Sequence, residues 1–352
     1  MSARQVTPSR IGNTSLAVTR LGLGGAALGN IYQAVTEQDA QATIDASWDV
    51  GQRYFDTAPL YGFGLSEQRL GVGLAERPRD QVVISTKAGY ALREPGTQGP
   101  GVMDVTIFDQ PLAAQPVMDF SREATLRGVE ESLARLRTDR LDIVYIHDAD
   151  ESVATREGGD PYARSHFKEA MAGVYPTLME LKSQGVITAV GVGMNQWQML
   201  VDFAREAPFD CFMVAGRYTL IDQTALPVLL PLCLEKKISV VIAGPYASGI
   251  LATGPVPGAH FNYLPADQEI LGRVKGIQAV CRRHKVPLQA AALQFPFGHP
   301  AVVAAVPGGR SATEVQQNAA FLNYPIPDAL WSELQNRGLI EEIAPVPAWS
   351  DG

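Results

Sequence analysis

Leu141-Asp-Ile-Val-Tyr-Ile-His147 and Ile238-Ser-Val-Val-Ile-Ala243 are the two stretches that decide the fold class. Both are short and almost continuously apolar, rather than alternating between apolar and polar residues. Runs of this kind are typical of strands that are covered on both faces, as in a parallel sheet packed between helices. The two stretches therefore favour an α/β fold with a parallel sheet.

Six further runs of similar length extend this pattern along the chain. They are Val18 to Gly22, Arg53 to Thr57, Val82 to Lys87, Ile187 to Gly193, Cys211 to Ala215 and Val302 to Val306. Amphipathic segments lie between the runs, and the first places Ala40, Ile44 and Trp48 at a spacing of four after the capping-box pattern Thr36-Glu-Gln-Asp39. Another places Leu126, Val129, Leu133 and Leu136 on one face after Ser121, and further helices are predicted over 168–183, 197–205, 224–236, 268–284 and 311–322. Eight strand–helix units predict a (β/α)8 TIM barrel, with a doubly wound open sheet as the alternative.

We expect one domain over residues 1–352, because no linker or shift in composition divides the repeat. Two segments lie outside it. Residues 5–17 contain the turn dipeptide Gly12-Asn13 and predict an N-terminal β-hairpin. Residues 91–118, rich in proline and glycine, predict a long loop insertion at the C-terminal mouth of the barrel, of the kind that contacts substrate.

Composition excludes several classes of partner. The chain has 29 basic and 37 acidic side chains and a net charge of −8, which argues against nucleic acid and against an anionic membrane. Cys211, Cys233 and Cys281 lie far apart, without a CxxC motif or a histidine at metal spacing, so we expect reduced, buried thiols and no metal site. No signal-peptide run and no stretch of 18 apolar residues is present, and this predicts a cytoplasmic protein that does not span a membrane.

A glycine-rich stretch near the N-terminus formally fits a dinucleotide-binding fingerprint. Gly22-Leu-Gly24-Gly-Ala-Ala27 matches the pattern, and Asp56 ends the next predicted strand. In that fingerprint the glycines open directly into a helix whose N-terminus meets the pyrophosphate. Here residues 28–35 intervene before the predicted helix, so the sequence disfavours this interpretation.

Polar side chains follow three consecutive predicted strands. Asp56 and Tyr61 follow the second strand, Lys87 ends the third and His147 ends the fourth. The carboxyl ends of barrel strands converge on one mouth, so an acid, a phenol, an amine and an imidazole are expected to face each other there. Each has a simpler explanation, because Asp56 could cap a turn, Tyr61 could be a loop aromatic and Lys87 could be a solvated strand end. Their occurrence together favours a catalytic site.

These four side chains fit proton transfer coupled to hydride transfer. A group of adjustable pKa can give a proton to a carbonyl oxygen or take one from an alcohol, and Tyr61 is the candidate. A free phenol has a pKa near 10, and we expect the Lys87 ammonium to favour the phenolate. Asp56 is expected to keep Lys87 charged and oriented, and His147 to hydrogen-bond the reacting oxygen.

The stretch Phe55-Asp-Thr-Ala-Pro-Leu-Tyr-Gly-Phe-Gly-Leu-Ser-Glu-Gln-Arg-Leu-Gly71 resembles the first signature of the aldo-keto reductases. The resemblance continues over nearly the whole chain, through Gly191-Val-Gly-Met-Asn195, Val214-Ala-Gly-Arg-Tyr218, Gly244-Pro-Tyr-Ala-Ser-Gly-Ile-Leu251 and Pro307-Gly-Gly-Arg-Ser311. It implies that Asp56, Tyr61, Lys87 and His147 are catalytic. Within the family, His147-Asp-Ala-Asp150 and Ala215-Gly-Arg-Tyr-Thr-Leu-Ile-Asp222 resemble the aldose 1-dehydrogenase branch, which implies oxidation of an aldose such as L-fucose, D-arabinose or L-galactose to its lactone.

The same resemblance implies NAD or NADP as cofactor. It places the cofactor against Gly25, Ala26, Asp56, Asn195, Pro245, Gly249, Leu251, Gly309, Arg310, Glu314, Gln317 and Asn318. NADP-specific members place basic residues where the match puts Gly308 and Glu314. A carboxylate at Glu314 repels a 2′-phosphate and accepts hydrogen bonds from a ribose diol, so NAD is preferred. Arg310 keeps NADP open, and Glu314 could equally serve only as a capping box with Ser311.

Two departures from the family and several alternatives remain. Ala215 stands where a glutamine is frequent, and Ala243 stands where an aromatic often stacks on the nicotinamide, so Tyr246 is expected to stack there, or stacking is weaker. Asp148, Asp150, Arg217 and Asn195 near the rim favour a polyol substrate. A pyridoxal 4-dehydrogenase or general aldehyde reductase using the same site is the alternative, followed by a non-catalytic nucleotide-sensing subunit. We expect a small sugar or aldehyde as the only partner, and a monomer or weak homodimer.

Overall fold

A computed structural model describes residues 8–150 and 165–348 of the chain. Its centre is an eight-stranded sheet of parallel strands, with β8 next to β5 and β9, and β11 next to β10 and β14. The strands are β3 (Leu23–Gly24), β4 (Tyr54–Asp56), β5 (Val83–Ala88), β8 (Leu141–His147), β9 (Ile187–Met194), β10 (Cys211–Ala215), β11 (Ser239–Ala243) and β14 (Val302–Val306).

Hydrogen bonds join the two outer strands, β3 and β14, and close the sheet into a barrel. The N–H of Gly22 donates to the Ala305 carbonyl and the N–H of Gly24 to the Pro307 carbonyl, each at 2.9 Å. Gly24 has no room for a side chain, because a Cβ there would lie 2.6 Å from the Val306 carbonyl oxygen. The predicted (β/α)8 barrel is confirmed, and the open-sheet alternative is wrong.

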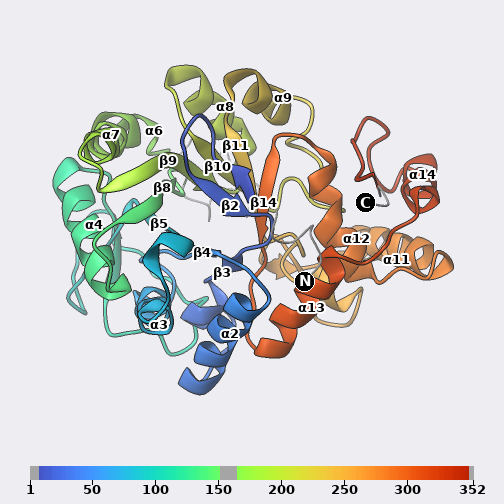
Figure 1. Cartoon of the computed structure of the whole chain (residues 1–352), viewed down its shortest axis with the longest axis horizontal. Coiled ribbons are helices and arrows are strands. Elements are labelled where there is room, and N and C mark those ends of the chain that lie inside the picture. Colours follow the sequence, from blue (N-terminus) through green and yellow to red (C-terminus); the bar gives the residue numbers. More distant parts are fainter. Residues whose placement is uncertain (1–7, 151–164, 349–352) are drawn as a thin grey trace.

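Helices surround the strands as a ring (Figure 1). They are α2 (Glu37–Asp49), α3 (Leu65–Leu74), α4 (Arg122–Leu136), α6 (Phe167–Glu169), α7 (Tyr175–Ser183), α8 (Trp197–Glu206), α9 (Leu229–Lys236), α10 (Ile250–Thr253), α11 (Gln268–Arg283), α12 (Leu288–Gln294), α13 (Ala312–Leu322) and α14 (Asp328–Asn336), and the π-helical turn Ala170–Val174 joins α6 to α7. Neighbouring helices pack side by side, as α2 does against α3 and α13. None of the helices in residues 8–150 and 165–348 combines the length and the apolar character needed to cross a membrane.

Smaller elements lie in the connections between strands and helices. Three short 3-10 helices cover Ala27–Gly29, Arg79–Gln81 and Phe295–Gly298. A two-residue ribbon pairs β12 (His260–Phe261) with β13 (Leu264–Pro265) in the loop between α10 and α11. These elements shape the loops and leave the order of the barrel strands unchanged.

Two details of the predicted helices are wrong. The helix expected over 224–236 begins only at Leu229, because the Asp222 carboxylate accepts the N–H of Thr224 and holds the preceding residues in a turn. On α4, Leu126 does not belong to the buried face: it is 36% exposed, whereas Val129 and Leu136 are buried.

The N-terminal hairpin covers the end of the barrel where the strands begin. Its strands are β1 (Pro8–Arg10) and β2 (Ala17–Thr19), so it extends two residues beyond the predicted 5–17; residues 5–7 lie outside the described part of the chain. Because β2 takes Val18 and Thr19 for pairing with β1, the strand predicted over 18–22 is replaced by the short β3. Ile11 and Val18 are fully buried against the residues that fill the barrel.

The long insertion over 91–118 forms a two-stranded ribbon at its ends. It starts as β6 (Tyr90–Arg93) and ends as β7 (Gln115–Met118), and the two strands pair antiparallel. Between them, the Ile107 carbonyl accepts the N–H of Tyr32 at 2.8 Å, and the N–H of Leu112 donates to the Gly62 carbonyl at 3.1 Å. The segment therefore lies across the C-terminal mouth.

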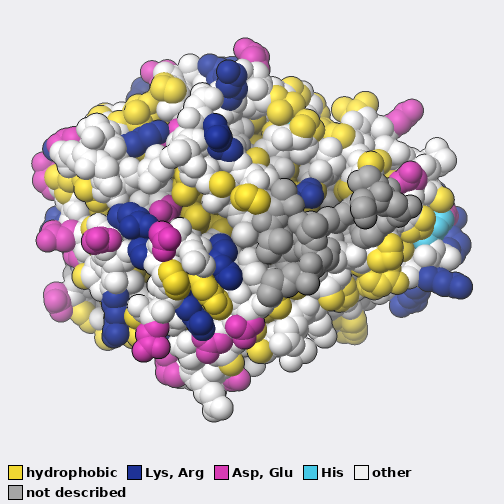
Figure 2. Space-filling view, viewed as in Figure 1, with side chains coloured by type: hydrophobic (Ala, Val, Ile, Leu, Met, Phe, Trp, Pro, Cys, Tyr) yellow, Lys and Arg dark blue, Asp and Glu magenta, His cyan; other side chains and the backbone are white. Residues whose placement is uncertain are grey.

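Acidic and basic side chains are interspersed on the face of the molecule seen in Figure 2.

Candidate active site

A cavity of about 890 Å³ opens at the carboxyl ends of the barrel strands. Asp56 ends β4, Lys87 is the next-to-last residue of β5, His147 ends β8, and Tyr61 lies in the loop after β4. All four residues line this cavity. They come from three strands that are neighbours in the sheet, so the structure brings together the four residues that were predicted to be catalytic.

Lys87 and Asp56 form a buried ion pair. The ammonium nitrogen of Lys87 lies 2.8 and 3.0 Å from the two carboxylate oxygens of Asp56, and it donates to the Thr57 carbonyl at 2.7 Å. The two side chains are only 2% and 3% exposed. Burial raises the pKa of Asp56, and the neighbouring Lys87 ammonium opposes this rise. The position of the ammonium is therefore fixed by three acceptors.

The Tyr61 phenol lies beside this pair, but its pKa moves in the direction opposite to the one expected. The Lys87 nitrogen is 4.7 Å from the centroid of the Tyr61 ring. Burial, followed by the carboxylates of Asp56 and Asp148, raises the pKa of Tyr61 well above its usual value. Burial of the phenol and the two carboxylates near it therefore overturn the expected lowering. Tyr61 is consequently a protonated phenol at neutral pH.

His147 is a buried, neutral imidazole. Burial, and then the Lys87 charge, lowers the pKa of His147 well below its usual value. Its ring packs edge-on against Tyr61 and Tyr90, with centroids 5.9 and 5.2 Å apart. Among the described residues its Nδ1 has no hydrogen-bond partner. A buried ring nitrogen of this kind can hydrogen-bond an oxygen of a bound molecule.

The sequence analysis missed five aromatic residues that line the cavity, which are Tyr32, Tyr90, Phe108, Tyr263 and Phe321. Tyr90 and Phe108 both line it, and the Phe108 ring lies 6.2 Å from that of Tyr61. Tyr90 could have been found, because it follows Lys87 by three residues at the end of a predicted strand. Nothing in the sequence marks Phe108, which comes from the middle of the long insertion. Asp148 adopts a φ of 45°, an uncommon value for a residue other than glycine.

Most of the residues predicted to hold the cofactor line the same cavity. These are Gly25, Ala26, Asp56, Asn195, Pro245, Gly249, Arg310, Glu314, Gln317 and Asn318. Leu251 and Gly309 do not line it. Leu251 is fully buried in the apolar core, and Gly309 is buried, with the side chains of Leu23 and Val315 beside the position that a Cβ would take.

The start of α13 forms one end of the cavity. Ser311 caps the helix by accepting the N–H of Glu314 at 3.3 Å, and the Glu314 carboxylate accepts the N–H of Arg310, one residue before the N–H expected from a capping box. The Arg310 guanidinium donates to the Ile31 carbonyl at 3.1 Å. Its Nε is buried and has no partner among the described residues. A buried, unpaired guanidinium N–H fits a phosphate oxygen, so this end of the cavity suits a dinucleotide.

Two further predicted positions are held by hydrogen bonds on the cavity wall. The Asn195 side-chain amide donates to the Ala215 carbonyl at 3.0 Å. The Tyr246 hydroxyl donates to the Asn318 side-chain oxygen at 2.6 Å, which draws Tyr246 toward α13. Ala243 also lines the cavity. Stacking of Tyr246 on a nicotinamide stays a prediction.

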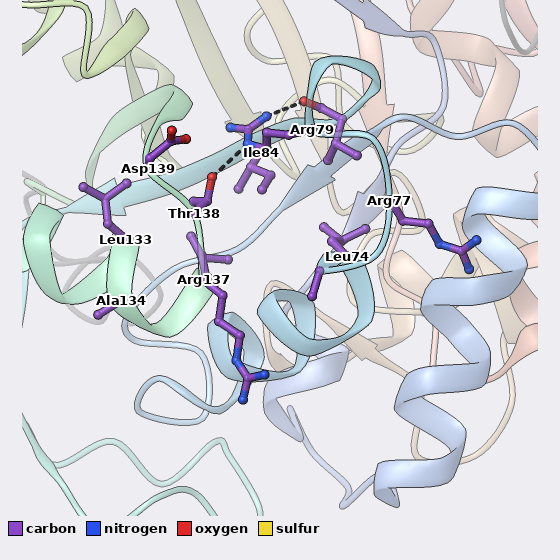
Figure 3. A pocket seen from close by; sticks show the side chains of 12 residues that line it. Leu74, Arg77, Arg79, Ile84, Leu133, Ala134, Arg137, Thr138 and Asp139 are labelled. Atoms are coloured by element: carbon purple, nitrogen blue, oxygen red, sulfur yellow. Dashed lines mark hydrogen bonds between the residues drawn. The ribbon is translucent and has the colours of Figure 1, made fainter.

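A second hollow, of about 590 Å³, lies between the ends of α3 and α4 and holds none of the predicted site residues (Figure 3). Two of its arginines already have partners, since Arg79 donates to Thr138 in the same hollow at 2.8 Å and Arg77 pairs with Asp45 outside it at 2.9 Å. The three cysteines are buried and free, as expected. No group of three or more His, Cys, Asp or Glu side chains within residues 8–150 and 165–348 is arranged to hold a metal ion.

Comparison with known proteins identifies the family of this chain. Residues 20–337 match the model of the aldo/keto reductase family. The chain is 38% identical to a D-threo-aldose 1-dehydrogenase of Pseudomonas sp., over 92% of this chain and 95% of the relative, and 37% identical to a pyridoxal 4-dehydrogenase of Microbacterium luteolum, over 94% and 97%. An aldo-keto reductase structure from Bacillus halodurans superposes with a TM-score of 0.72 at 23% identity, over 98% of this chain and 99% of that one. This chain is therefore a member of the aldo/keto reductase family and an NAD(P)-dependent oxidoreductase.

Proposed function

We propose that this enzyme oxidises an aldose of the L-fucose, D-arabinose or L-galactose type at its anomeric C1 hydroxyl, giving the lactone. One observation carries the proposal: Tyr61 and His147 face the same cavity as the buried Lys87–Asp56 pair. The substrate class is supported by the 38% identity to a D-threo-aldose 1-dehydrogenase and by 28% identity to an L-galactose dehydrogenase of Arabidopsis thaliana. We expect it to act in the cytoplasm, as a monomer or weak homodimer.

Each of the proposed catalytic residues in the cavity has a different role in this reaction. A bound nicotinamide supplies the hydride acceptor. In its deprotonated form, Tyr61 takes the proton of the anomeric hydroxyl, and His147, as a neutral imidazole, holds that oxygen within reach of the phenolate. Lys87, fixed by Asp56 and Thr57, provides a positive charge that stabilises the Tyr61 phenolate before it accepts the proton. Because the pKa of Tyr61 is raised, we expect oxidation to accelerate as the pH rises above neutrality.

The test of the activity is NADH formation with a panel of L-fucose, D-arabinose, L-galactose, pyridoxal and simple alcohols. We expect turnover of the aldoses, and a loss of about 10²- to 10⁴-fold in Tyr61→Phe, which lacks the proton acceptor. Dinucleotide affinity, measured by NADH fluorescence, should stay within a few fold. Near-full turnover by Tyr61→Phe would contradict the assigned role.

Cofactor preference is proposed to favour NAD, through the Glu314 carboxylate at the start of α13. Glu314 is exposed and lines the cavity. The resemblance to the family implies that the adenosine end of the cofactor binds at this helix start, where a 2′-phosphate would meet the like charge of Glu314. We expect Glu314→Lys to raise kcat/KM with NADP relative to NAD by about tenfold or more, because an ammonium that attracts the 2′-phosphate replaces a carboxylate that repels it. A tenfold change in this ratio corresponds to about 1.4 kcal/mol. Thr313→Lys, at the exposed position one residue earlier, is the control and should change the ratio less, because it leaves the Glu314 carboxylate in place. An unchanged ratio in Glu314→Lys, or a wild-type preference for NADP, contradicts the proposal.

The alternative is a pyridoxal 4-dehydrogenase or a general aldehyde reductase. The aromatic wall made by Tyr90 and Phe108, and the 37% identity to the pyridoxal enzyme, support it. An apolar wall suits an aromatic aldehyde, whereas a sugar needs hydrogen-bonding groups. Turnover of pyridoxal without turnover of any aldose in the same panel would favour this alternative.

A further inference from the structure

Three buried hydroxyl groups form a chain through the barrel that ends on Asp56. The hydroxyls of Tyr145 and Tyr54 lie 3.1 Å apart, the Tyr54 hydroxyl lies 3.1 Å from Ser85 Oγ, and Ser85 Oγ lies 2.6 Å from Asp56 Oδ1. Tyr54, Ser85 and Tyr145 are 0% exposed. None of the three lines the cavity, so none can touch a substrate.

The surroundings of this chain are apolar except for the Cys211 thiol, which shares a side-chain hydrogen bond with Tyr145. Tyr54 and Tyr145 pack in the barrel interior with Val83, Ile143 and Met213. A buried hydroxyl costs free energy unless it is hydrogen-bonded, and phenylalanine would fill the same space without that cost. The packing of the barrel explains the two rings but not their hydroxyls. The hydroxyls have a role as hydrogen-bonding groups that lead to the Asp56 carboxylate at the end of the chain.

The protons of this chain all point toward Asp56. An ionised carboxylate can only accept, so the single proton of Ser85 belongs to the short bond with Asp56. The 3.1 Å contact is then a bond in which Tyr54 donates to Ser85 Oγ, and Tyr145 in turn donates to the Tyr54 oxygen. Donors aligned in this way reinforce one another and favour the negative charge at the end of the chain.

We propose that Ser85 and Tyr54 are positioning residues that keep the Asp56 carboxylate ionised and oriented, and through it keep the Lys87 ammonium in place beside Tyr61. The proposal rests on the proposed function only in using that pair for turnover. Asp56 is also subject to the opposing influence of burial, which raises its pKa, while Lys87 and the Ser85 hydroxyl lower it. Without the Ser85 donor, Asp56 takes up a proton at higher pH, and Lys87 loses its counter-charge.

Several other charged and titratable groups lie around Asp56. They are Lys87 of β5, Tyr54 of β4 itself, Tyr61 of the following loop with Asp148 near it, Tyr145 and His147 of β8, and Cys211 of β10. His147 is neutral, and the phenols and the thiol are protonated at neutral pH, because burial lowers the pKa of the imidazole and raises those of the phenols and the thiol. Asp56 is thus the group whose charge state the chain controls.

The first experiment follows kcat/KM against pH in Ser85→Ala, Tyr54→Phe and the conservative Ser85→Thr. We expect Ser85→Ala to lose about tenfold at neutral pH and to move the acidic limb of the profile up by about one pH unit, the size of a hydrogen bond to a charged group. Tyr54→Phe keeps the ring but loses the hydroxyl, so it should also move the acidic limb to higher pH, by less than Ser85→Ala does. Ser85→Thr retains the hydroxyl and should restore most of the rate. A uniform loss at every pH, with the limb unmoved, overturns the proposal.

Tyr218→Phe and Ser47→Ala are matched controls, because they remove fully buried hydroxyls that do not belong to the chain ending on Asp56. Tyr218 has no hydrogen-bond partner among the described residues, and Ser47 bonds within α2 to the Thr43 carbonyl. Both variants should keep the wild-type pH profile. If Ser85→Ala does not fold, Tyr54→Phe carries the same test, since it removes one oxygen and preserves the packing.

A second readout needs no substrate. Infrared difference spectra recorded against pH detect the C=O stretch of a protonated carboxyl group, and Asp56→Asn identifies the band that belongs to Asp56. We expect this band to appear at higher pH in Ser85→Ala and Tyr54→Phe than in the wild type. Identical midpoints overturn the proposal. If the panel of sugars and aldehydes gives no turnover, the proposed function fails while this measurement still decides on the hydroxyl chain.

Discussion

At the scale of single residues, His147 makes the stability of the protein depend on pH. Burial lowers its pKa well below the usual value, whereas in the unfolded chain a histidine titrates near 6.5. Below that pH the unfolded chain binds a proton that the native state does not. The contribution of His147 to stability is therefore complete above about pH 6.5 and is lost as the pH falls toward the native pKa.

We predict that His147→Asn flattens the fall in the free energy of unfolding between pH 7 and pH 5. The wild type should lose up to about 1.4 kcal/mol more per pH unit than the variant over part of this range. Urea unfolding at several pH values measures the difference. His260→Asn, at an exposed position, is the control and should keep the wild-type slope. Equal slopes in His147→Asn and wild type would show that the imidazole is not buried as a neutral group.

The sequence predicted residues well where strand order decides their place. Asp56, Lys87 and His147 were found because strand ends converge in a barrel, and that reasoning needs no side-chain geometry. The pKa of Tyr61 was predicted in the wrong direction, because the sequence does not show how completely the phenol is buried or that the Asp148 carboxylate lies near it. Leu251 was assigned to the cofactor by position in a motif, but its side chain is buried in the core.

At the scale of elements, the carboxylate of Glu67 ties three of them together. It lies on α3, is fully buried, and accepts from Thr86 of β5 and from Arg135 of α4, each at 2.6 Å. Thr86 directly precedes Lys87, so this junction also supports the strand end that carries the proposed catalytic amine. Because the Glu67 carboxylate is buried, removing its charge leaves the Arg135 guanidinium without its buried partner and destabilises the fold.

We predict that Glu67→Gln lowers the free energy of unfolding by about 2–3 kcal/mol, because the amide keeps the shape but loses the charge opposite Arg135. Equilibrium unfolding in urea measures the loss. Glu131→Gln is the matched control: the Glu131 side chain is 35% exposed and lies 3.7 Å from the same guanidinium, and its removal should cost less than about 1 kcal/mol. A comparable loss in both variants would contradict the role given to burial.

Elements with a local signal were predicted, and elements defined by pairing were not. Thr36, Ser121 and Ser311 cap α2, α4 and α13 as the sequence indicates, because a capping hydroxyl acts within its own turn. The first barrel strand is only Leu23–Gly24, and its place depends on which residues the hairpin takes for itself. No local pattern contains that information.

At the scale of the whole molecule, the hairpin closes the end of the barrel opposite the cavity. Ile11 lies at its turn, is fully buried, and packs in the same cluster as Tyr54 and Tyr145. The adjacent N–H of Gly12 donates to Ser239 at 2.8 Å, which ties the hairpin to β11. The hairpin is thus part of the core that fills the barrel.

We predict that Ile11→Ala lowers the free energy of unfolding by about 2–4 kcal/mol, through lost apolar burial and the cavity left behind. Urea unfolding measures the loss, and a turnover assay at a temperature where the variant is folded should give nearly the wild-type kcat. Val72→Ala, at a position that is 51% exposed, should change stability by less than about 0.5 kcal/mol. A loss below about 1 kcal/mol for Ile11→Ala would mean that the hairpin is not part of the core.

The overall architecture was predictable because eight repeats outweigh errors in any one of them. The path of residues 91–118 was not, since it depends on contacts with distant loops. That segment is attached by main-chain hydrogen bonds, from Tyr32 N–H to Ile107 and from Leu112 N–H to Gly62. These main-chain bonds do not depend on which side chains the segment carries, and one side chain, the Asp109 carboxylate, adds to them by accepting the N–H of Ala34 at 3.1 Å. It is accordingly an exchangeable module: its inward-facing residues, such as Phe108, can be replaced to retune substrate choice while the anchoring of the segment is kept.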